Sequence, residues 1–462
     1  METRTERDSM GEFEVPVEAY YGANTMRAVV NFPISDLRLP RGFIRALGLI
    51  KQAAAQTNAE LGLLEPRLAD AVVRAAQDVV DGTLDDDFVV DVFQTGSGTS
   101  TNMNANEVIS NRAIELLGGE KGSRTPVHPN DHVNLGQSSN DVIPSAIHVA
   151  AAVDVHDRLI PALRRLEDSL RRRSEALWGV IKTGRTHLQD ATPIRLGQEF
   201  LGWAGQAERS RRRAAAALEE LSELALGGTA VGTGVNTHPD FARMVIERVA
   251  GATGVPLRET TNHFQAQSRL DGVVAASSAM RTIAVSLYTI ASDLRLLGCG
   301  PRAGIAEIAL PAVQPGSSIM PGKVNPVICE SVTMVAAQVM GNDAAVAFAG
   351  AAGSLLELNV MMPVAAYNLL QSIAILSTSA VNLAEQAIDG VEATGNGPRL
   401  VEQGLMTCTA LAPRIGYDAA AAIAKEAFRS GRTVREVARD RTELSDEELT
   451  ELLDPVRMTE PG

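Results

Sequence analysis

Residues 316–326 read Gly316-Ser-Ser-Ile-Met-Pro-Gly-Lys-Val-Asn-Pro326, and this stretch decides how the rest of the chain is interpreted. Its two glycines and two prolines interrupt any helix or strand, so it is predicted to be a loop. A glycine-rich loop that carries two hydroxyls, a lysine and an amide can close around a small anion and bring backbone N–H groups close to it. A surface loop with ordinary turn chemistry is an equal alternative from composition alone, so the flanking sequence must decide.

The composition favours a large helical protein. The chain has 462 residues, which is enough for two to four domains with a sizeable core. Hydrophobic residues make up 45% and aromatic residues only 4%, so Ala, Leu, Val and Ile must fill the core, which favours helix-on-helix packing. The net charge of −14 argues against nucleic acid and anionic membranes as partners. An anionic substrate would need a local positive pocket, because the overall field repels it.

Three features bear on the cellular compartment. The cysteines Cys299, Cys329 and Cys408 have no metal-like spacing, which suggests a reducing compartment with neither a disulfide framework nor a zinc site. Residues 1–7 are charged and lack an apolar signal region. No apolar run is expected to approach the length of a membrane span. The sequence therefore predicts a soluble, cytoplasmic protein.

The chain alternates between helical stretches and polar loops. Residues 1–35 contain spaced Gly and Pro and predict short strands and turns. Ala- and Leu-rich patterns then predict helices, in order, at 41–80, 155–170 with a kink at Pro161, 195–221, 269–298, 327–348 and 364–388. The cluster at 395–398 marks the end of the last of these, and a small helical tail is expected at 399–462. About five long helices are too apolar to stand alone, which favours a bundle and an oligomer.

Three further polar loops lie among these helices. Residues 94–104 read Gln-Thr-Gly-Ser-Gly-Thr-Ser-Thr-Asn-Met-Asn and are predicted to lead into a helix near Asn104. Residues 128–141 end at another predicted helix start, with Pro144 in its first turn, and residues 184–193 form a third break. Helix N-termini present free N–H groups and a positive dipole end to anions. The run at 94–104 could equally be a plain helix cap, whereas residues 128–141 contain more amides and hydroxyls than capping needs. An isolated histidine in residues 128–141 is more often solvent-facing than a ligand.

The polar loops together suit a small dicarboxylic acid as ligand. Each carboxylate needs several N–H and O–H donors and only a few cations. No set of Asp, Glu and His has a convincing metal spacing. The glycines around Gly96 do not match a dinucleotide fingerprint, and no nucleotide P-loop occurs.

Four of these stretches resemble, in the same order, the motifs of the fumarase/aspartase superfamily, and the resemblance covers nearly the whole chain. The signature of that superfamily looks like residues 316–326, and its three other regions are similar to residues 94–104, 137–141 and 184–190.

Within the superfamily, the sequence is more similar to class II fumarases than to aspartases. Residues 95–99 (Thr-Gly-Ser-Gly-Thr), Ser139 and Gly322 have the fumarase form. Residues 20–22 and 358–363 look more like aspartases.

The resemblance implies a mainly α, three-domain fumarase/aspartase fold. Its parts would be a mixed, mostly helical N-terminal domain at 1–137, a central bundle of five long helices at 138–394 and a small helical C-terminal domain at 395–462. Four copies would form a homotetramer with a twenty-helix core, in which three subunits share each active site. The implied activity is the reversible anti hydration of fumarate to L-malate in the tricarboxylic acid cycle, with these small dicarboxylates as substrates and no cofactor or metal.

The resemblance also implies roles for individual residues. Ser317 would be the base, acting as an alkoxide that N–H donors and Lys323 stabilise. His187, oriented and charged by Glu330, would protonate the leaving hydroxyl directly or through a water molecule. The expected substrate-binding residues are Ser97, Gly98, Thr99, Ser138, Ser139, Asn140, Thr186, Ser318, Lys323, Val324 and Asn325. A second dicarboxylate site is implied at His128, Pro129, Asn130 and Asp131.

Several alternatives stay open at this point. The nearest is an aspartate ammonia-lyase or a related amino-dicarboxylate lyase, which the forms of Ser139 and Gly322 disfavour. A non-catalytic helical structural protein would not need the five residues Ser317, Lys323, Asn325, His187 and Glu330. A nucleotide-linked lyase would be expected to show basic phosphate contacts, which the sequence lacks. His187 could also be a helix-cap histidine, and Glu330 an exposed acid at a helix start.

Overall fold

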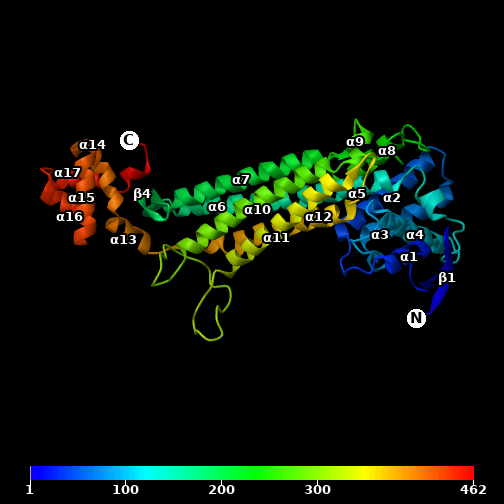
Figure 1. Cartoon of the computed structure of the whole chain (residues 1–462), viewed down its shortest axis with the longest axis horizontal. Coiled ribbons are helices and arrows are strands. Elements are labelled where there is room, and N and C mark those ends of the chain that lie inside the picture. The colour runs from blue at the N-terminus through cyan, green and yellow to red at the C-terminus, as the bar shows by residue number, and fades with distance from the viewer. Residues whose placement is uncertain (1, 462) are drawn as a thin grey trace. The chain divides into compact units, whose positions relative to one another are not determined.

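The computed structural model of the chain describes residues 2–461 and is mainly helical, as the composition predicted (Figure 1). The chain forms two compact units, and the divisions between them fall inside or beside the long helices. Unit 1 consists of Met1–Pro161, Arg211–Ala284 and Ala336–Ser377. Unit 2 consists of Ala162–Ser210, Val285–Val335 and Thr378–Gly462.

Unit 1 combines an N-terminal hairpin with helices that pack on α2 and α4. The buried carboxylate of Glu107, on α4, accepts hydrogen bonds from the backbone N–H groups of Gly22, Asn24 and Thr25 at 2.9, 3.0 and 3.0 Å. These bonds fix the start of α1 against α4, because a buried carboxylate must be satisfied by donors. The elements are β1 Thr3–Asp8, β2 Gly11–Pro16, α1 Ala23–Asn31, α2 Arg41–Glu60, α3 Pro66–Asp81, α4 Thr99–Leu116, α5 Ser139–Asp154, β5 Glu223–Leu224, α8 Phe241–Thr253, β6 Arg258–Glu259, α9 His263–Ser268, β8 Ser354–Leu355 and β9 Leu358–Asn359.

Five long helices contribute to both units, and most of the predicted positions are confirmed to within a few residues. They are α6 Ile160–Ala176, α7 Leu196–Leu221, α10 Asp271–Leu297, α11 Val327–Gly353 and α12 Met362–Gln386. The kink expected at Pro161 takes the form of a π turn at Val155–Leu159, which joins α5 to α6 just before this proline.

The expectation about membrane spans was wrong. Among the described residues, the helical stretches Asp271–Leu297, Val327–Gly353 and Met362–Gly390 are long and apolar enough to cross a membrane by length and composition. The reason is their high content of Ala, Val, Ile and Leu with very few charges, which a bundle helix that is covered on several sides shares with a membrane span.

Unit 2 holds a hairpin and a small C-terminal helical region. The hairpin strands are β3 Ile181–Thr186 and β4 Gln189–Arg195, and a second short pair joins β7 Ile308–Ala309 to β10 Glu392–Ala393. The C-terminal helices pack on a buried cluster that includes Leu411, Ile423, Val437 and Leu449, which confirms the predicted helical tail. These helices are α13 Asn396–Gln403, α14 Ala412–Ile415, α15 Tyr417–Ser430, α16 Val434–Arg441 and α17 Asp446–Leu452.

Several local predictions need correction. Helix α4 begins at Thr99 and not near Asn104, because Gly98 supplies the left-handed residue (φ +73°) at which the loop ends. Pro144 lies inside α5 and not in its first turn, because the Ser138–Asp141 capping box already starts the helix at Ser139.

Three further corrections concern a hairpin and two helices. The break at 184–193 is part of the β3–β4 hairpin, in which β-branched residues favour the extended backbone. The cluster at 395–398 starts α13 after a short strand, where an end of the preceding helix was predicted. Helix α1 was missed altogether within a region predicted as strands and turns.

Candidate active site

The signature loop, residues 316–326, closes on itself through backbone and side-chain hydrogen bonds. The N–H of Gly316 donates to the carbonyl of Lys323 at 2.8 Å, and Asn325 Nδ2 donates to the carbonyl of Gly316 at 2.6 Å. Lys323 Nζ donates to Asn325 Oδ1 at 2.5 Å. A side chain at Gly316 is excluded, since its Cβ would lie 2.4 Å from the carbonyl oxygen of Lys323. The glycine therefore lets the two ends of the loop meet.

Ser317 lies in this loop with its hydroxyl oxygen facing backbone donors. Its Oγ accepts hydrogen bonds from the N–H groups of Ile319 and Met320 at 3.3 and 3.0 Å. Two backbone N–H groups on one oxygen form a small concave anion site. They favour negative charge on Oγ, which is the property that a serine needs to act as a base.

The other residues of the signature loop that were predicted to bind substrate lie at the surface of unit 2. Ser318, Lys323 and Val324 are exposed, and Asn325 is partly buried. Lys323, Val324 and Asn325 line a cavity of about 840 Å³ together with Glu330 and Arg295. The cavity contains both signs of charge, so it can hold a polar ligand or a polar segment of another chain.

Cys329, the residue before Glu330, is buried and free. Burial raises the pKa of its thiol to about 11, so it stays protonated at neutral pH. A protonated, buried thiol is neither a nucleophile nor a metal ligand.

His187 sits at the tip of the β3–β4 hairpin. Thr186 ends β3 and Gln189 begins β4, so His187 and Leu188 are the two central residues of the turn, with φ of 55° and 57°. Positive φ at both central positions is the feature of type I′ turns, which suit the twist of a hairpin. Thr186 and His187 are exposed. Within residues 2–461, the imidazole of His187 forms no hydrogen bond or ion pair, so the structure does not bring it to Glu330 within the chain.

The base of this hairpin is held by a buried ion network that the sequence did not reveal. Arg185 forms a bidentate pair with Glu307, with both N–O distances 2.9 Å, and the Glu307 side chain is 0% exposed. Lys182 Nζ also contacts Glu307 at 3.2 Å and Glu199 at 2.8 Å. The network fixes the strand that carries Thr186 and His187 to the chain just before β7, because bidentate buried pairs have a defined geometry.

The predicted residues of unit 1 form a chain of hydroxyl contacts at two helix starts. Ser97 Oγ lies 2.8 Å from Thr99 Oγ1, which in turn lies 2.8 Å from Ser139 Oγ. Gly98 precedes α4, and Ser138 caps α5 through Asn140 N. The structure thus brings the 94–104 and 137–141 loops together, with free N–H groups and the positive ends of two helix dipoles beside the hydroxyls. We call Ser97, Gly98, Thr99, Ser138, Ser139 and Asn140 the hydroxyl cluster.

Asp141 connects the hydroxyl cluster to the glycine-rich loop at residues 227–229 through hydrogen bonds. Its fully buried carboxylate accepts hydrogen bonds from the N–H groups of Ser138, Gly227 and Thr229 at 2.9, 3.0 and 3.0 Å. Burial raises the pKa of this carboxyl, while the three N–H donors oppose the rise. The capping pattern of residues 138–141 could have predicted the bond to Ser138, but not the two bonds from the distant glycine-rich loop.

The segment proposed as a second dicarboxylate site forms a compact turn in unit 1. Pro129–Val133 is a π turn, and His128 Nδ1 accepts from the N–H groups of Asn130 and Asp131 at 3.2 Å each. The carboxylate of Asp131 lies 3.3 Å from the same nitrogen. Asn130 and Asp131 are exposed, and Pro129 is buried beneath them.

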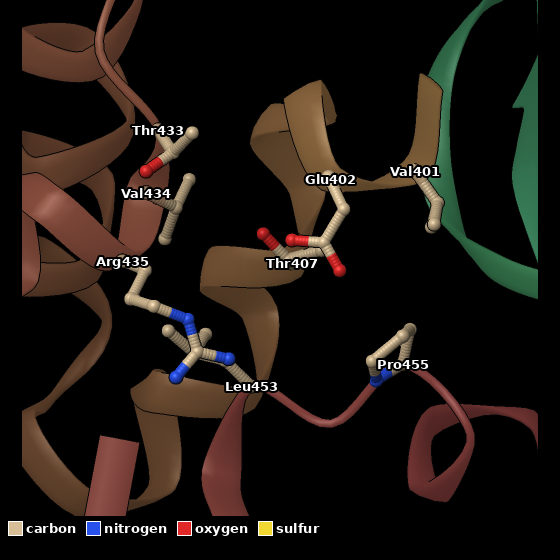
Figure 2. A pocket seen from close by; sticks show the side chains of 8 residues that line it. All are labelled: Val401, Glu402, Thr407, Thr433, Val434, Arg435, Leu453 and Pro455. Atoms are coloured by element: carbon tan, nitrogen blue, oxygen red, sulfur yellow. The ribbon is translucent and has the colours of Figure 1, made fainter. Parts of the chain in front are cut away.

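Neither a metal centre nor the C-terminal pocket offers an alternative site for a dicarboxylate among the described residues. Among residues 2–461, no group of three or more His, Cys, Asp and Glu side chains is placed to hold a metal ion. The small C-terminal pocket in Figure 2 has the side chains of Glu402 and Arg435 directed into it, but its volume is about 50 Å³. This is the space of one or two water molecules, which is too little for a dicarboxylate.

Comparisons with known proteins assign the family. A family described as Lyase matches residues 11–341, and a family described as Fumarase C C-terminus matches residues 408–460. "Fumarate hydratase class II 2" of Bradyrhizobium diazoefficiens is 51% identical over 461 residues, which cover 100% of this chain and 97% of that protein. "Fumarate hydratase class II" of Halobacterium salinarum is 54% identical over 460 residues, covering 99% and 97%.

A solved structure agrees with the sequence relatives. The recombinant class II fumarase from Schistosoma mansoni superposes with a TM-score of 0.96 at 38% identity, and the match covers 99% of both chains. The chain therefore belongs to the lyase family of the class II fumarate hydratases.

Proposed function

We propose that this chain is a class II fumarate hydratase that interconverts fumarate and L-malate, with Ser317 as the base. The observation that carries the proposal is the pair of backbone N–H groups directed at Ser317 Oγ inside the closed signature loop. The full-length identity to named fumarate hydratases supports the same reaction.

In the malate direction, Ser317 removes a proton from the carbon next to one carboxylate. The product is an aci-carboxylate that carries two negative charges on that group, and donors aimed at this charge lower the barrier. The N–H groups of Ile319 and Met320 together with the Lys323 ammonium stabilise the serine alkoxide. Lys323 and Asn325 then hold the carboxylate, with Ser318 as a further donor.

The hydroxyl group leaves as water after it receives a proton. His187 supplies that proton directly or through a bound water molecule, and Glu330 orients and charges the imidazole. The hydroxyl cluster and Thr186 bind the substrate carboxylates, because hydroxyls and helix N-termini offer many donors without excess positive charge. The 128–131 segment binds a second dicarboxylate through its exposed backbone and side chains.

The functional protein is a homotetramer in which three subunits share each site. Support comes from α11, where the apolar side chains of Met334 and Phe348 are 67% and 64% exposed in the single chain. Exposed apolar faces on a long helix mark a surface that another chain covers. The lack of a partner for His187 within residues 2–461 also fits a site that a second subunit completes, and Glu330 of that subunit is the partner we propose.

The same proposal includes a three-domain division at 1–137, 138–394 and 395–462 and a cytoplasmic location. The C-terminal family match, which begins at residue 408, supports a separate C-terminal part. Sedimentation of the purified protein checks the assembly, since a homotetramer has four times the mass of the chain.

Replacement of Ser317 tests the reaction and its base together. Fumarate formation from L-malate, followed by ultraviolet absorbance, is compared for the wild type, Ser317→Ala and Ser318→Ala. The wild type is expected to be active, and loss of a general base is expected to lower kcat by about 10²–10⁴-fold in Ser317→Ala. Ser318→Ala, which removes only a neighbouring donor, should lose much less. Near-normal turnover by folded Ser317→Ala would show that the base is another group.

A further inference from the structure

Lys51 is a fully buried cation in an otherwise apolar stretch of α2. It follows Ile50, and both side chains are 0% exposed. Removing an ammonium group from water is strongly unfavourable unless hydrogen bonds replace its water shell. Burial accordingly lowers the pKa of Lys51 to about 7, although the negative charge of Asp141 opposes the fall. A buried ionisable group with such a shift is a candidate for function.

The hydrogen bonds of Lys51 go to the loop that leads into the hydroxyl cluster. Lys51 Nζ donates to Asn134 Oδ1 at 2.8 Å and to Gln137 Oε1 at 3.0 Å. Gln137 is directly followed by Ser138, the first residue of the cluster in this loop. Both acceptors are amide groups without a charge. Their orientation therefore depends on hydrogen bonds, and the Lys51 ammonium supplies one donor to each of them.

The same loop is braced from within and from α4. Asn134 Nδ2 donates to the carbonyl of Gln137 at 3.1 Å, and Gln137 Nε2 donates to the carbonyl of Val133 at 3.1 Å. Asn102, on the first turn of α4, donates to Asn134 Oδ1 at 3.2 Å. Asn134 therefore connects Lys51 to both helix starts that carry the cluster, and a shift of the ammonium would move both.

The positive charge of Lys51 is not cancelled by a contacting acid. Within residues 2–461, Lys51 forms no ion pair, and the oxygens of the nearby Asp141 carboxylate are held by the three backbone N–H groups described above. The hydroxyl cluster itself contains no cation. The chain has a net charge of −14, which repels a dicarboxylate. The buried Lys51 ammonium places a positive charge near the hydroxyl cluster, whose donors would bind that dicarboxylate.

We propose that Lys51 is a positioning residue for substrate binding. It orients Asn134 and Gln137, so that the hydroxyl cluster is pre-organised to bind a carboxylate. It also adds the positive charge that the cluster lacks. This inference rests on the proposed function in that the ligand is a dicarboxylate. Lys51 acts through the loop and does not touch the substrate, so its removal weakens binding more than it slows the chemical step.

The test compares Lys51→Met and Lys51→Gln with Gln52→Met. Methionine keeps most of the length of the side chain and removes the charge, whereas glutamine keeps a neutral NH2 group as donor. Gln52, the next residue on α2, bonds instead to Gln77 Oε1 at 2.8 Å on α3, so Gln52→Met controls for general loosening of the helix. The measurements are KM and kcat with L-malate, and the affinity for succinate, an unreactive dicarboxylate, by calorimetry.

Lys51→Met is expected to raise KM and weaken succinate binding by about tenfold or more, since a hydrogen bond from a charged group and its field are both lost. Its kcat should change less than its KM. Lys51→Gln should lie between Lys51→Met and the wild type, and Gln52→Met should bind succinate as the wild type does.

Unchanged KM and succinate affinity in folded Lys51→Met or Lys51→Gln would overturn the inference. If neither variant folds, Asn134→Ala removes the acceptor from the same loop and must raise KM for the inference to stand. Wild-type turnover of malate tests the proposed function alone, whereas the ratio of succinate affinities tests the role of Lys51 without any turnover.

Discussion

The substitution Gly316→Ala tests whether closure of the signature loop is what makes Ser317 a base. An added Cβ would lie 2.4 Å from the carbonyl oxygen of Lys323 and 2.9 Å from the N of Asn325, whereas ordinary contacts begin at 3.4 Å. Both obstacles are backbone atoms, which cannot rotate away. The two ends of the loop must therefore separate by about 1 Å.

This separation determines the expected losses of loop stability and of catalytic rate. The 2.8 Å bond from Gly316 N to the carbonyl of Lys323 and the 2.6 Å bond from Asn325 Nδ2 to the carbonyl of Gly316 are both broken or lengthened. At about 1 kcal/mol for each bond, the loss of both destabilises the loop by about 2 kcal/mol. A displacement of about 1 Å in a catalytic group lowers the rate by about 10²-fold, which corresponds to about 2.7 kcal/mol.

The assay is kcat and KM for fumarate formation from L-malate, with Gly322→Ala as the matched control. Gly322 belongs to the same loop and has φ +79°, but a Cβ there would meet nothing within 4 Å. Its substitution adds only backbone strain of about 1–2 kcal/mol and no collision. Gly316→Ala should lose about 10²-fold in kcat and Gly322→Ala less than about tenfold. Equal losses in both variants, or near-normal kcat in Gly316→Ala, would refute the reasoning.

Three further predictions concern other parts of the site. His187→Asn should keep the hairpin, because Asn tolerates positive φ, yet lower kcat by about 10²–10⁴-fold, so a lower melting temperature with normal kcat would contradict the acid role. Gly96→Ala should raise KM and lower the melting temperature, since its Cβ would lie 1.7 Å from the carbonyl oxygen of Val360 and must displace the adjoining Ser97; unchanged values of both would be contrary to this packing. Folded Lys51 loses its proton near pH 7 and unfolded lysine near 10.5, so the unfolded chain binds more protons between these values and the stability of the wild type relative to Lys51→Met should rise by about 1.4 kcal/mol per pH unit there. Urea unfolding of both proteins from pH 7 to 9 measures this slope, and a flat difference would mean that burial does not lower the pKa of Lys51.

Much of the helical fold could be predicted from local sequence. The limits of α7 and α10 followed from apolar periodicity and flanking breakers, since those signals are local. The start of α4 was misplaced because Ser, Thr and Asn are poor helix formers by propensity. Packing of Asn102, Asn104 and Asn106 in the interior overrides that preference.

The hairpin that carries His187 shows what local sequence could not provide. The turn residues His187 and Leu188 lack the Gly or Asn that normally signals a type I′ turn. The hairpin is held by the distant Glu307 through its ion pair with Arg185. The sequence around neither residue contains a signal that predicts this contact. A constraint from elsewhere in the chain can hold a backbone conformation that the residues themselves disfavour.

The candidate site was found through motifs, and its supporting residues were not. The residues of the hydroxyl cluster were all named from the sequence, because two of the loops resemble motifs of the fumarase/aspartase superfamily. Lys51 was passed over, since a single lysine in an Ala-rich helix normally faces solvent. Only its three-dimensional position, with Asn134 and Gln137 as acceptors, indicates a role.

The most direct test of the central claim is the ultraviolet absorbance of fumarate formed by the purified wild-type protein, with L-malate in one cuvette and L-aspartate in the other. A class II fumarate hydratase is expected to form fumarate from L-malate and none from L-aspartate. Fumarate from L-aspartate alone would contradict it and would mean that the leaving group is ammonia. It would then be residues 20–22 and 358–363, which look more like aspartases, that indicate the substrate.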